Sequence, residues 1–303
     1  MSATRATPET VEALAPARAP GWRARSRRLR AAVRERLHGR DLVLASAGAT
    51  LYGALAVVPS LLVAVALAQV VLGRAAVADW GARLADTLPG AMGAPDAAAR
   101  LLDAGLTLTP VGVLFAVVMG SAYGEGLSRA LRRFAPVPLE VKRRGIALRA
   151  ATLPLLGLAP LMLSGMLALA PWLADIVRHQ GAVGVALASY VSLNAIWIAT
   201  WAPLTWTFHV VGPGNPSWLS AFAGAVVTGA FVSGFLQGFL VFLALPVDLG
   251  RPFGGLVGVG VASALLLWLW VLHLVVVLGY AFMWGIEAER TGRTTDPPAR
   301  PES

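Results

Sequence analysis

Long stretches without a single charged residue dominate the hydrophobic pattern of this chain. They comprise residues 42–73, 104–124, 150–174, 179–247 and 252–286. A helix needs about 20 apolar residues to cross the hydrocarbon core of a bilayer. The stretch 179–247 is too long for one crossing, and GPGNP at 212–216 divides it by a tight turn. The pattern predicts an all-α integral membrane protein, a bundle of six transmembrane helices at about 42–73, 104–124, 150–174, 182–211, 218–246 and 254–286.

Composition supports this prediction. Hydrophobic residues make up 57% of the 303 residues, charged residues only 14%, and the mean hydropathy of +0.68 is too high for a soluble globular domain. Cysteine is absent, which excludes disulfides, thiolate metal sites and cysteine nucleophiles.

Basic residues are distributed unevenly between the loops. The segment before the first apolar run, the loop after the second run and the tail after the last run together carry 20 of the 25 basic residues. Positively charged loops resist translocation, so these segments are predicted to be cytoplasmic, with both termini inside and a multi-pass location in a bacterial inner membrane. The predicted domains are a disordered arginine-rich segment 1–34, a transmembrane domain 35–290 and a disordered tail 291–303.

The loop after the second run, SAYGEGLSRALRRFAPVPLEVKRRG at 121–145, raises the question of a nucleic-acid partner. Its only aromatic residue between the basic positions is Phe134, whereas single-stranded nucleic acid binds to platforms of several aromatic rings. We therefore expect no nucleic acid. Because the arginine-rich N-terminal segment lies on the same predicted side, the expected partners are anionic lipid head groups.

The loop on the opposite side, residues 73–105, contains Trp80, Leu84 and Leu88 at helical spacing with charges between them. This pattern predicts an amphipathic helix at the outer membrane interface, acting as a cap over the bundle.

Polar residues within the apolar runs are the first candidates for function, because they are costly inside a bilayer. Glu125 lies at the end of the second run, with Arg129 four residues later on the same helix face. One interpretation is a salt bridge at the helix end. The other is a carboxylate that gates a path or couples it to protons.

Asn194, His209, Gln237 and His273 are further candidates in the fourth, fifth and sixth runs. Each either fastens neighbouring helices by a hydrogen bond or contributes to a polar path. His273, near the middle of its run, is the best candidate for a proton relay or a substrate contact. Pairs of glycines four apart, Gly120 with Gly124, Gly234 with Gly238 and Gly254 with Gly258, favour close helix contacts.

The sequence lacks several common motifs of enzymes. The four histidines form no i, i+4 pair, and neither a phosphate-binding GxxxxGK[ST] loop nor a GxSxG elbow occurs. We therefore predict no catalytic residue, no metal and no cofactor, and a protein that is not an enzyme.

Four blocks in order resemble a known family. They are DLVLASAGATLYGALAVVPSLLV in the first run, GEGLSRALRRFAPV after the second, PGNPSWLSAFAGAVVTGAFVSGFLQGFLVFL in the fifth, and FGGLVGVGVASALLLWLWVLHLVVVLGYAFMWGIEAE in the sixth. Over residues 35–290 the chain resembles the YihY/BrkB family of bacterial inner-membrane proteins, some of which carry the label ribonuclease BN-like. By this resemblance Tyr52, Pro59, Gly279 and Glu287 occupy characteristic family positions. The chain departs from the closing pattern at Tyr280, Phe282 and Trp284, where a small or polar residue is common.

The resemblance implies six helices and a role in the cell envelope. Our leading hypothesis is transport or handling of a lipid or other small molecule, with Glu125, Asn194, Gln237 and His273 forming a sparse polar path. The alternative is a non-catalytic scaffold whose polar residues only fasten helices. A membrane-bound hydrolase or ribonuclease is the third hypothesis, and it is disfavoured because the cytoplasmic segments contain no cluster of metal ligands. Assembly into a homo-oligomer stays open.

Overall fold

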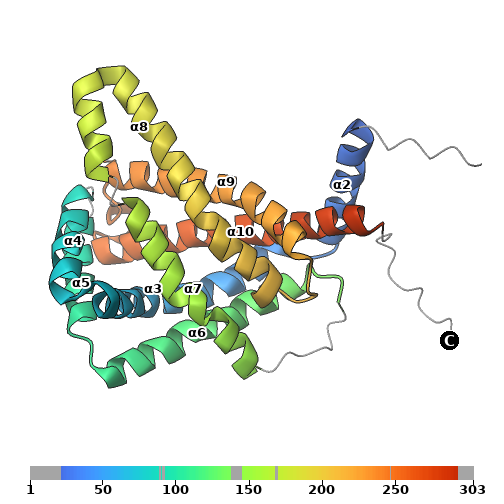
Figure 1. Cartoon of the computed structure of the whole chain (residues 1–303), viewed down its shortest axis with the longest axis horizontal. Coiled ribbons are helices and arrows are strands. Elements are labelled where there is room, and N and C mark those ends of the chain that lie inside the picture. Colours follow the sequence, from blue (N-terminus) through green and yellow to red (C-terminus); the bar gives the residue numbers. More distant parts are fainter. Residues whose placement is uncertain are drawn as a thin grey trace, which may run out of the picture.

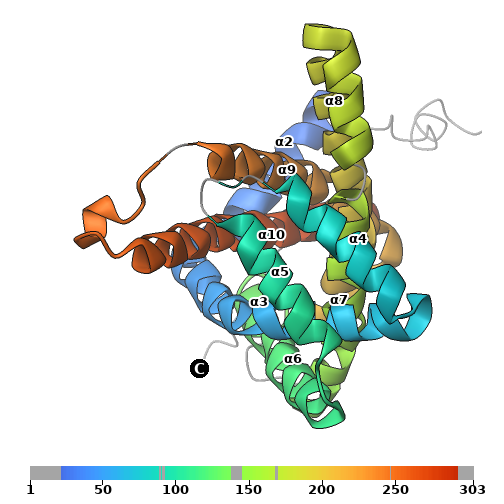
Figure 2. The same ribbon diagram turned by 90° about the vertical axis from the view of Figure 1, so that its left-hand side faces the viewer.

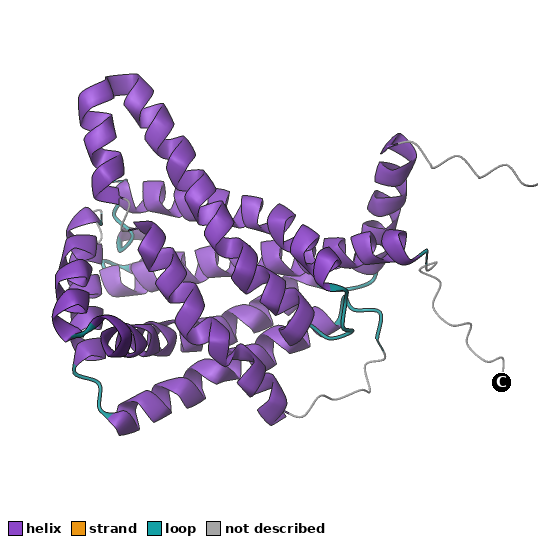
Figure 3. Cartoon of the chain, in the orientation of Figure 1, coloured by secondary structure: helices purple, strands orange, loops and turns teal. Residues whose placement is uncertain are grey.

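The computed structural model describes residues 22–88, 90, 93–137, 145–167, 170–245 and 247–292. The regular elements of these residues are all helical (Figure 3). In chain order they are α2 (Trp22–Leu37), α3 (Leu42–Leu72), α4 (Arg74–Thr87), α5 (Ala94–Leu106), α6 (Pro110–Arg132), α7 (Gly145–Leu167), α8 (Ala170–Trp206), the π-helical turn η2 (Thr207–Val211), α9 (Trp218–Ala244), the 3₁₀ turn η3 (Arg251–Phe253) and α10 (Val257–Thr291).

Within the described residues, five helices are long and apolar enough to cross a membrane: Leu42–Leu72, Pro110–Arg132, Gly181–Val211, Trp218–Phe239 and Val257–Thr291. The apolar part of α7, Gly145–Leu158, is shorter. The run 150–174, predicted as one helix, is divided between α7 and α8. Pro171 stands in the first turn of α8, where the missing N–H of proline removes no helical hydrogen bond.

Helices α3 and α10 form the centre of the bundle. Helix α3 packs against α4, α5, α6, α7 and α10, and α10 packs against α2, α3 and α9. In Figure 1, α4 and α5 cover one end of the bundle and α2 projects at the other. The view in Figure 2, turned by 90°, has α4 and α5 crossing in front of the longer helices. Buried groups on α3 or α10 can therefore contact more than one other helix.

The loop 73–105 differs from its prediction, because its residues belong to two helices, α4 and α5, rather than one. Trp80 and Leu84 belong to α4, but Leu88 lies just beyond its end. Residues 104–106, predicted as the start of the second membrane helix, instead end α5. Helix α6 begins at Pro110, where the Thr109 hydroxyl caps the helix by accepting from the N–H of Gly112 at 3.1 Å.

The N-terminal part of the chain also differs from its prediction. The sequence predicts disorder for residues 1–34, yet α2 is helical from Trp22 onward and packs against α10. Its apolar Leu29 faces Gly285 of α10, where an added Cβ would lie 2.8 Å from Leu29 Cδ1. Because arginines surround Leu29 in the sequence, the hydrophobic pattern does not reveal this narrow apolar face of α2. Residues 1–21 and 293–303 of the predicted disordered segments lie outside the described residues.

The turn at 212–216 packs against two aromatic residues of α10, Tyr280 and Trp284. Tyr280, fully buried, donates its hydroxyl hydrogen bond to the carbonyl of Pro213. Gly214 has a φ of 102° and lies against the ring of Trp284. Only glycine adopts such a backbone freely, and it leaves room for the indole. Tyr280 and Trp284, two of the residues that depart from the family's closing pattern, are thus core residues beneath this turn.

Helices α9 and α10 approach each other closely at Gly279. A Cβ added there would lie 2.0 Å from Oγ1 of Thr228, a fully buried residue of α9. Side chains on both helices would hold the two backbones apart, so glycine is required at this contact.

We predict that Gly279→Ala lowers the free energy of unfolding by about 1–3 kcal/mol, because the new methyl group overpacks the contact with Thr228. Thermal unfolding in detergent measures the effect. Gly234→Ala is the matched control, since nothing lies within 4 Å of its added Cβ. The variant Gly279→Ala/Thr228→Ala should recover part of the loss, and no recovery would contradict this explanation.

Candidate functional site

His273 is buried in the middle of α10, with 4% of its surface exposed. Its Nδ1 lies 2.8 Å from the carbonyl oxygen of Leu269 and 3.2 Å from Oγ1 of Thr50 on α3. Its Nε2 lies 3.0 Å from the hydroxyl of Tyr123 on α6. The imidazole thus joins three helices, and we call Thr50, Tyr123 and His273 the histidine junction.

The hydrogen bonds assign the protons of the histidine junction. A carbonyl accepts only, so Nδ1 carries the proton that it donates to Leu269. The Thr50 hydroxyl donates to the carbonyl of Ser46 at 2.8 Å and therefore accepts from Nδ1. None of the ion pairs between described residues includes His273, and an uncompensated charge is costly at such depth. The ring is neutral, and Nε2 accepts from Tyr123.

Gly53 makes room for this ring. It lies three residues after Thr50 on the same face of α3, and a Cβ there would lie 2.8 Å from Cε1 of His273. Sequence reasoning identified His273 but missed Thr50, Gly53 and Tyr123. The small and hydroxyl residues of one α3 face were a signal, but their partner on α10 is 223 positions away from Thr50.

Glu125 and Arg129 form the predicted i, i+4 ion pair. A second arginine, Arg149 of α7, lies 3.6 Å from the other carboxylate oxygen. Nη1 of Arg129 donates to the hydroxyl of Tyr52 at 2.8 Å, which links α6 to α3. The Arg129 side chain is 62% exposed and that of Glu125 25%, so the pair lies near the surface of the bundle rather than in its core.

The remaining polar candidates lie apart from the histidine junction. Gln237 of α9 accepts a hydrogen bond of 3.0 Å from the hydroxyl of Ser192 on α8. Asn194 donates to the carbonyl of Tyr190 in its own helix at 2.8 Å.

His209 lies in η2, with Nδ1 2.7 Å from the carbonyl of Pro216 and its ring stacked on Trp218 at 3.7 Å. The six candidates thus fall into separate groups rather than one cluster.

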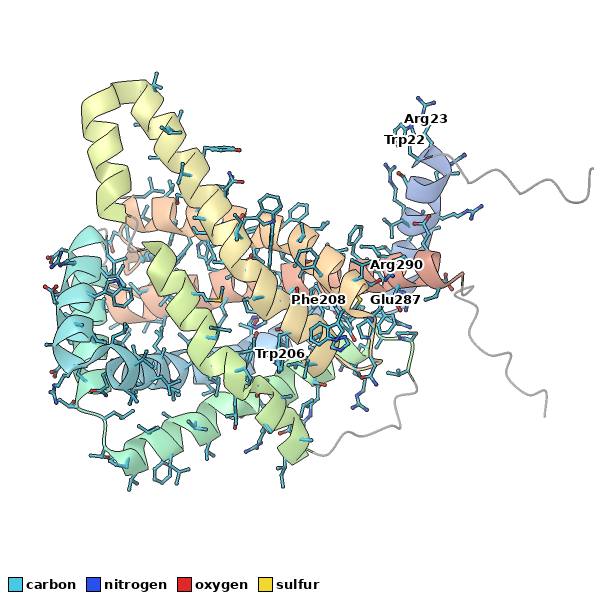
Figure 4. The ribbon with its side chains drawn as sticks, viewed as in Figure 1. Trp22, Arg23, Trp206, Phe208, Glu287 and Arg290 are labelled. Carbon is cyan, nitrogen blue, oxygen red and sulfur yellow. The ribbon has the colours of Figure 1, made fainter. Side chains whose placement is uncertain are left out.

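Three of the four family positions, Tyr52, Gly279 and Glu287, make contacts between elements. Glu287 accepts a hydrogen bond of 2.6 Å from Ser217, the residue that caps the N-terminus of α9. Arg290 donates to the same Ser217 hydroxyl at 2.7 Å and lies 3.8 Å from the Glu287 carboxylate. Figure 4 shows Glu287 and Arg290 on the C-terminal part of α10. Tyr52 packs against Gly126, and Pro59 lies inside α3, where it cannot donate a helical hydrogen bond.

No group of three or more histidine, aspartate or glutamate side chains suited to a metal ion occurs in the part of the chain that the structure describes.

Comparison with protein families gives a match over most of the chain. The model of the family described as Virulence factor BrkB matches residues 33–303. Neither the curated proteins nor the solved structures contain a match.

We predict that ¹⁵N spectra of histidine-labelled protein show His273 with a protonated Nδ1 and an unprotonated Nε2. Tyr123→Phe should shift the Nε2 signal and lower the stability by about 0.6 kcal/mol, up to ~1.7, as for other hydrogen bonds between membrane helices. Tyr52→Phe is the matched control, since its hydroxyl bonds Arg129 and leaves His273 unchanged. A protonated Nε2 would contradict the assignment.

Proposed function

Because the chain belongs to the Virulence factor BrkB family, we propose that it is a non-enzymatic protein of the bacterial inner membrane that transports or handles a lipid or another small molecule in envelope maintenance. The observation that carries the proposal is the histidine junction. In an apolar bundle with five candidate membrane helices, it joins α3, α6 and α10 through buried polar groups.

Energetics favour a functional interpretation of this junction. A leucine at position 273 would fill a similar space without a polar side chain of its own, so an imidazole with its hydrogen-bonding partners on two other helices is a costly way to fill it. The hydroxyls of Thr50 and Tyr123 both donate and accept, and each can exchange its partner for another. Polar groups with exchangeable partners let neighbouring helices shift without leaving buried groups unsatisfied, which suits a transporter.

We propose further that α7 provides a sixth crossing and that both termini are cytoplasmic. In Figure 1, α2, the end of α6, the start of α7 and the end of α10 lie toward one end of the bundle. These segments carry the basic residues Arg129, Arg132, Arg149 and Arg290, together with those of α2. The positive-inside rule assigns this end to the cytoplasm.

The same end is proposed to contact anionic lipid head groups. Five arginines of α2 are exposed at its surface: Arg23, Arg27, Arg28, Arg30 and Arg34. Each basic residue near an anionic leaflet contributes about 1 kcal/mol of attraction.

A scaffold is the second candidate function. It is favoured by one observation, namely that both nitrogens of His273 have partners, as expected of a residue that fastens helices.

The decisive prediction concerns complementation of a deletion strain, with envelope permeability and lipid composition as readouts. His273→Leu at matched membrane abundance should reduce the restored activity by about tenfold, the equivalent of one buried hydrogen bond at ~1.4 kcal/mol.

Asn194→Leu is the control for this experiment, since it removes a hydrogen bond within one helix only. Full activity of His273→Leu would contradict the transport proposal and favour the scaffold. Loss of activity in Asn194→Leu as well would indicate a general sensitivity of the bundle to substitution.

Orientation is tested with single cysteines, because the chain has none. Arg28→Cys on α2 and Arg100→Cys on α5 are both at exposed positions. In intact spheroplasts, an impermeant maleimide should label Arg100→Cys, and it should label Arg28→Cys only after lysis. The reverse pattern would overturn the proposed topology.

A further inference from the structure

Arg36 near the end of α2 is the most deeply buried of the arginines whose side chains the structure describes, with 9% of its surface exposed. Its Nε is buried and has no hydrogen-bond partner. None of the ion pairs between described residues includes it. The other described arginines of α2 are exposed or partly exposed, so Arg36 is the one that is directed into the protein.

Trp284 of α10 presents a second unsatisfied donor at the same place. The guanidinium carbon of Arg36 lies 5.8 Å from the centre of the Trp284 ring. The indole Nε1 is buried and also lacks a hydrogen-bond partner in the described chain. The ring is held by the edge of Tyr280 at 6.2 Å and by close contact with Gly214.

The local charge balance favours an anion beside these two donors. Burial lowers the pKa of Arg36, and the neighbouring cation Arg40 lowers it further, whereas Glu35 acts in the opposite direction. A guanidinium and an indole N–H donate only, so neither can satisfy the other. Buried donors of this kind are normally paired, and a guanidinium matches the oxygens of a phosphate.

We propose that Arg36 and Trp284 form a receptor for one phosphate group at the junction of α2 and α10. The guanidinium pairs with the phosphate charge, and the indole N–H donates to one of its oxygens. This inference rests on the proposed function, which puts the α2 end of the bundle at an anionic leaflet. It adds a particular buried site to the diffuse attraction of the exposed arginines.

The test uses the full-length protein purified in a non-ionic detergent. Native mass spectrometry measures retention of phosphatidylglycerol, with phosphatidylcholine as the zwitterionic comparison. The variants are Arg36→Gln and Trp284→Phe, the latter keeping an aromatic ring while removing the N–H. Arg28→Gln is the matched control, because it makes the same charge change at an exposed position of the same helix.

We expect Arg36→Gln to weaken phosphatidylglycerol retention by about tenfold or more, as for a lost hydrogen bond to a charged group. Trp284→Phe should weaken it several-fold, and Arg28→Gln should leave it close to wild type. Equal losses in Arg28→Gln and Arg36→Gln would overturn the site in favour of diffuse attraction, and so would retention unchanged in Arg36→Gln.

Two further arms identify the source of the phosphate and control for folding. If inorganic phosphate raises the melting temperature of wild type but not of Arg36→Gln, while phosphatidylglycerol is not retained, the ligand is free phosphate. Thermal unfolding without added lipid shows whether Arg36→Gln is folded. If it is not, the lipid retention of Trp284→Phe tests the site instead. Because binding is measured on isolated protein, its failure is distinct from a failure of complementation.

Discussion

A polar group inside hydrocarbon must find its partner within the protein, and this constraint governs the arrangement of the helices. His273 illustrates it, since one imidazole requires a backbone carbonyl of its own helix, Thr50 of α3 and Tyr123 of α6. Those partners are reached only if the three helices lie close together, and Gly53 provides the space. The junction therefore constrains how closely α3, α6 and α10 approach one another at His273.

The absence of charge was sufficient to locate several helices from sequence. The runs predicted at 42–73 and 218–246 correspond to α3 and α9, because hydrocarbon excludes charges wherever a helix crosses it. The absence of charge did not predict the helix bounds where a helix cap or a tertiary contact determines them. Pro110 and the Thr109 cap move the start of α6, and α2 forms because tertiary contact with α10 outweighs its arginine-rich composition. The six crossings and their orientation stay predictions.

The sequence predicted only some members of the candidate site. His273 was identifiable as a costly polar residue, and Glu125 with Arg129 by spacing, since both are properties of the local sequence. Close packing was not predictable, as the glycine pairs show. Added Cβ atoms at Gly120 and Gly124 would lie 3.1 Å from Leu156 and 2.1 Å from Thr152, yet nothing lies near Gly234, Gly254 or Gly258. Spacing alone does not reveal which face of a helix meets a neighbour.

Helix α10 connects the two regions to which functions are assigned. His273, Val277, Tyr280 and Trp284 recur at intervals of four, three and four residues, and all are buried, so they form one face of the helix. At 1.5 Å per residue, His273 and Trp284 are about 16 Å apart along it. The histidine junction and the proposed phosphate site therefore share one rigid element, and the buried face of α10 between them fixes the position of each relative to the other.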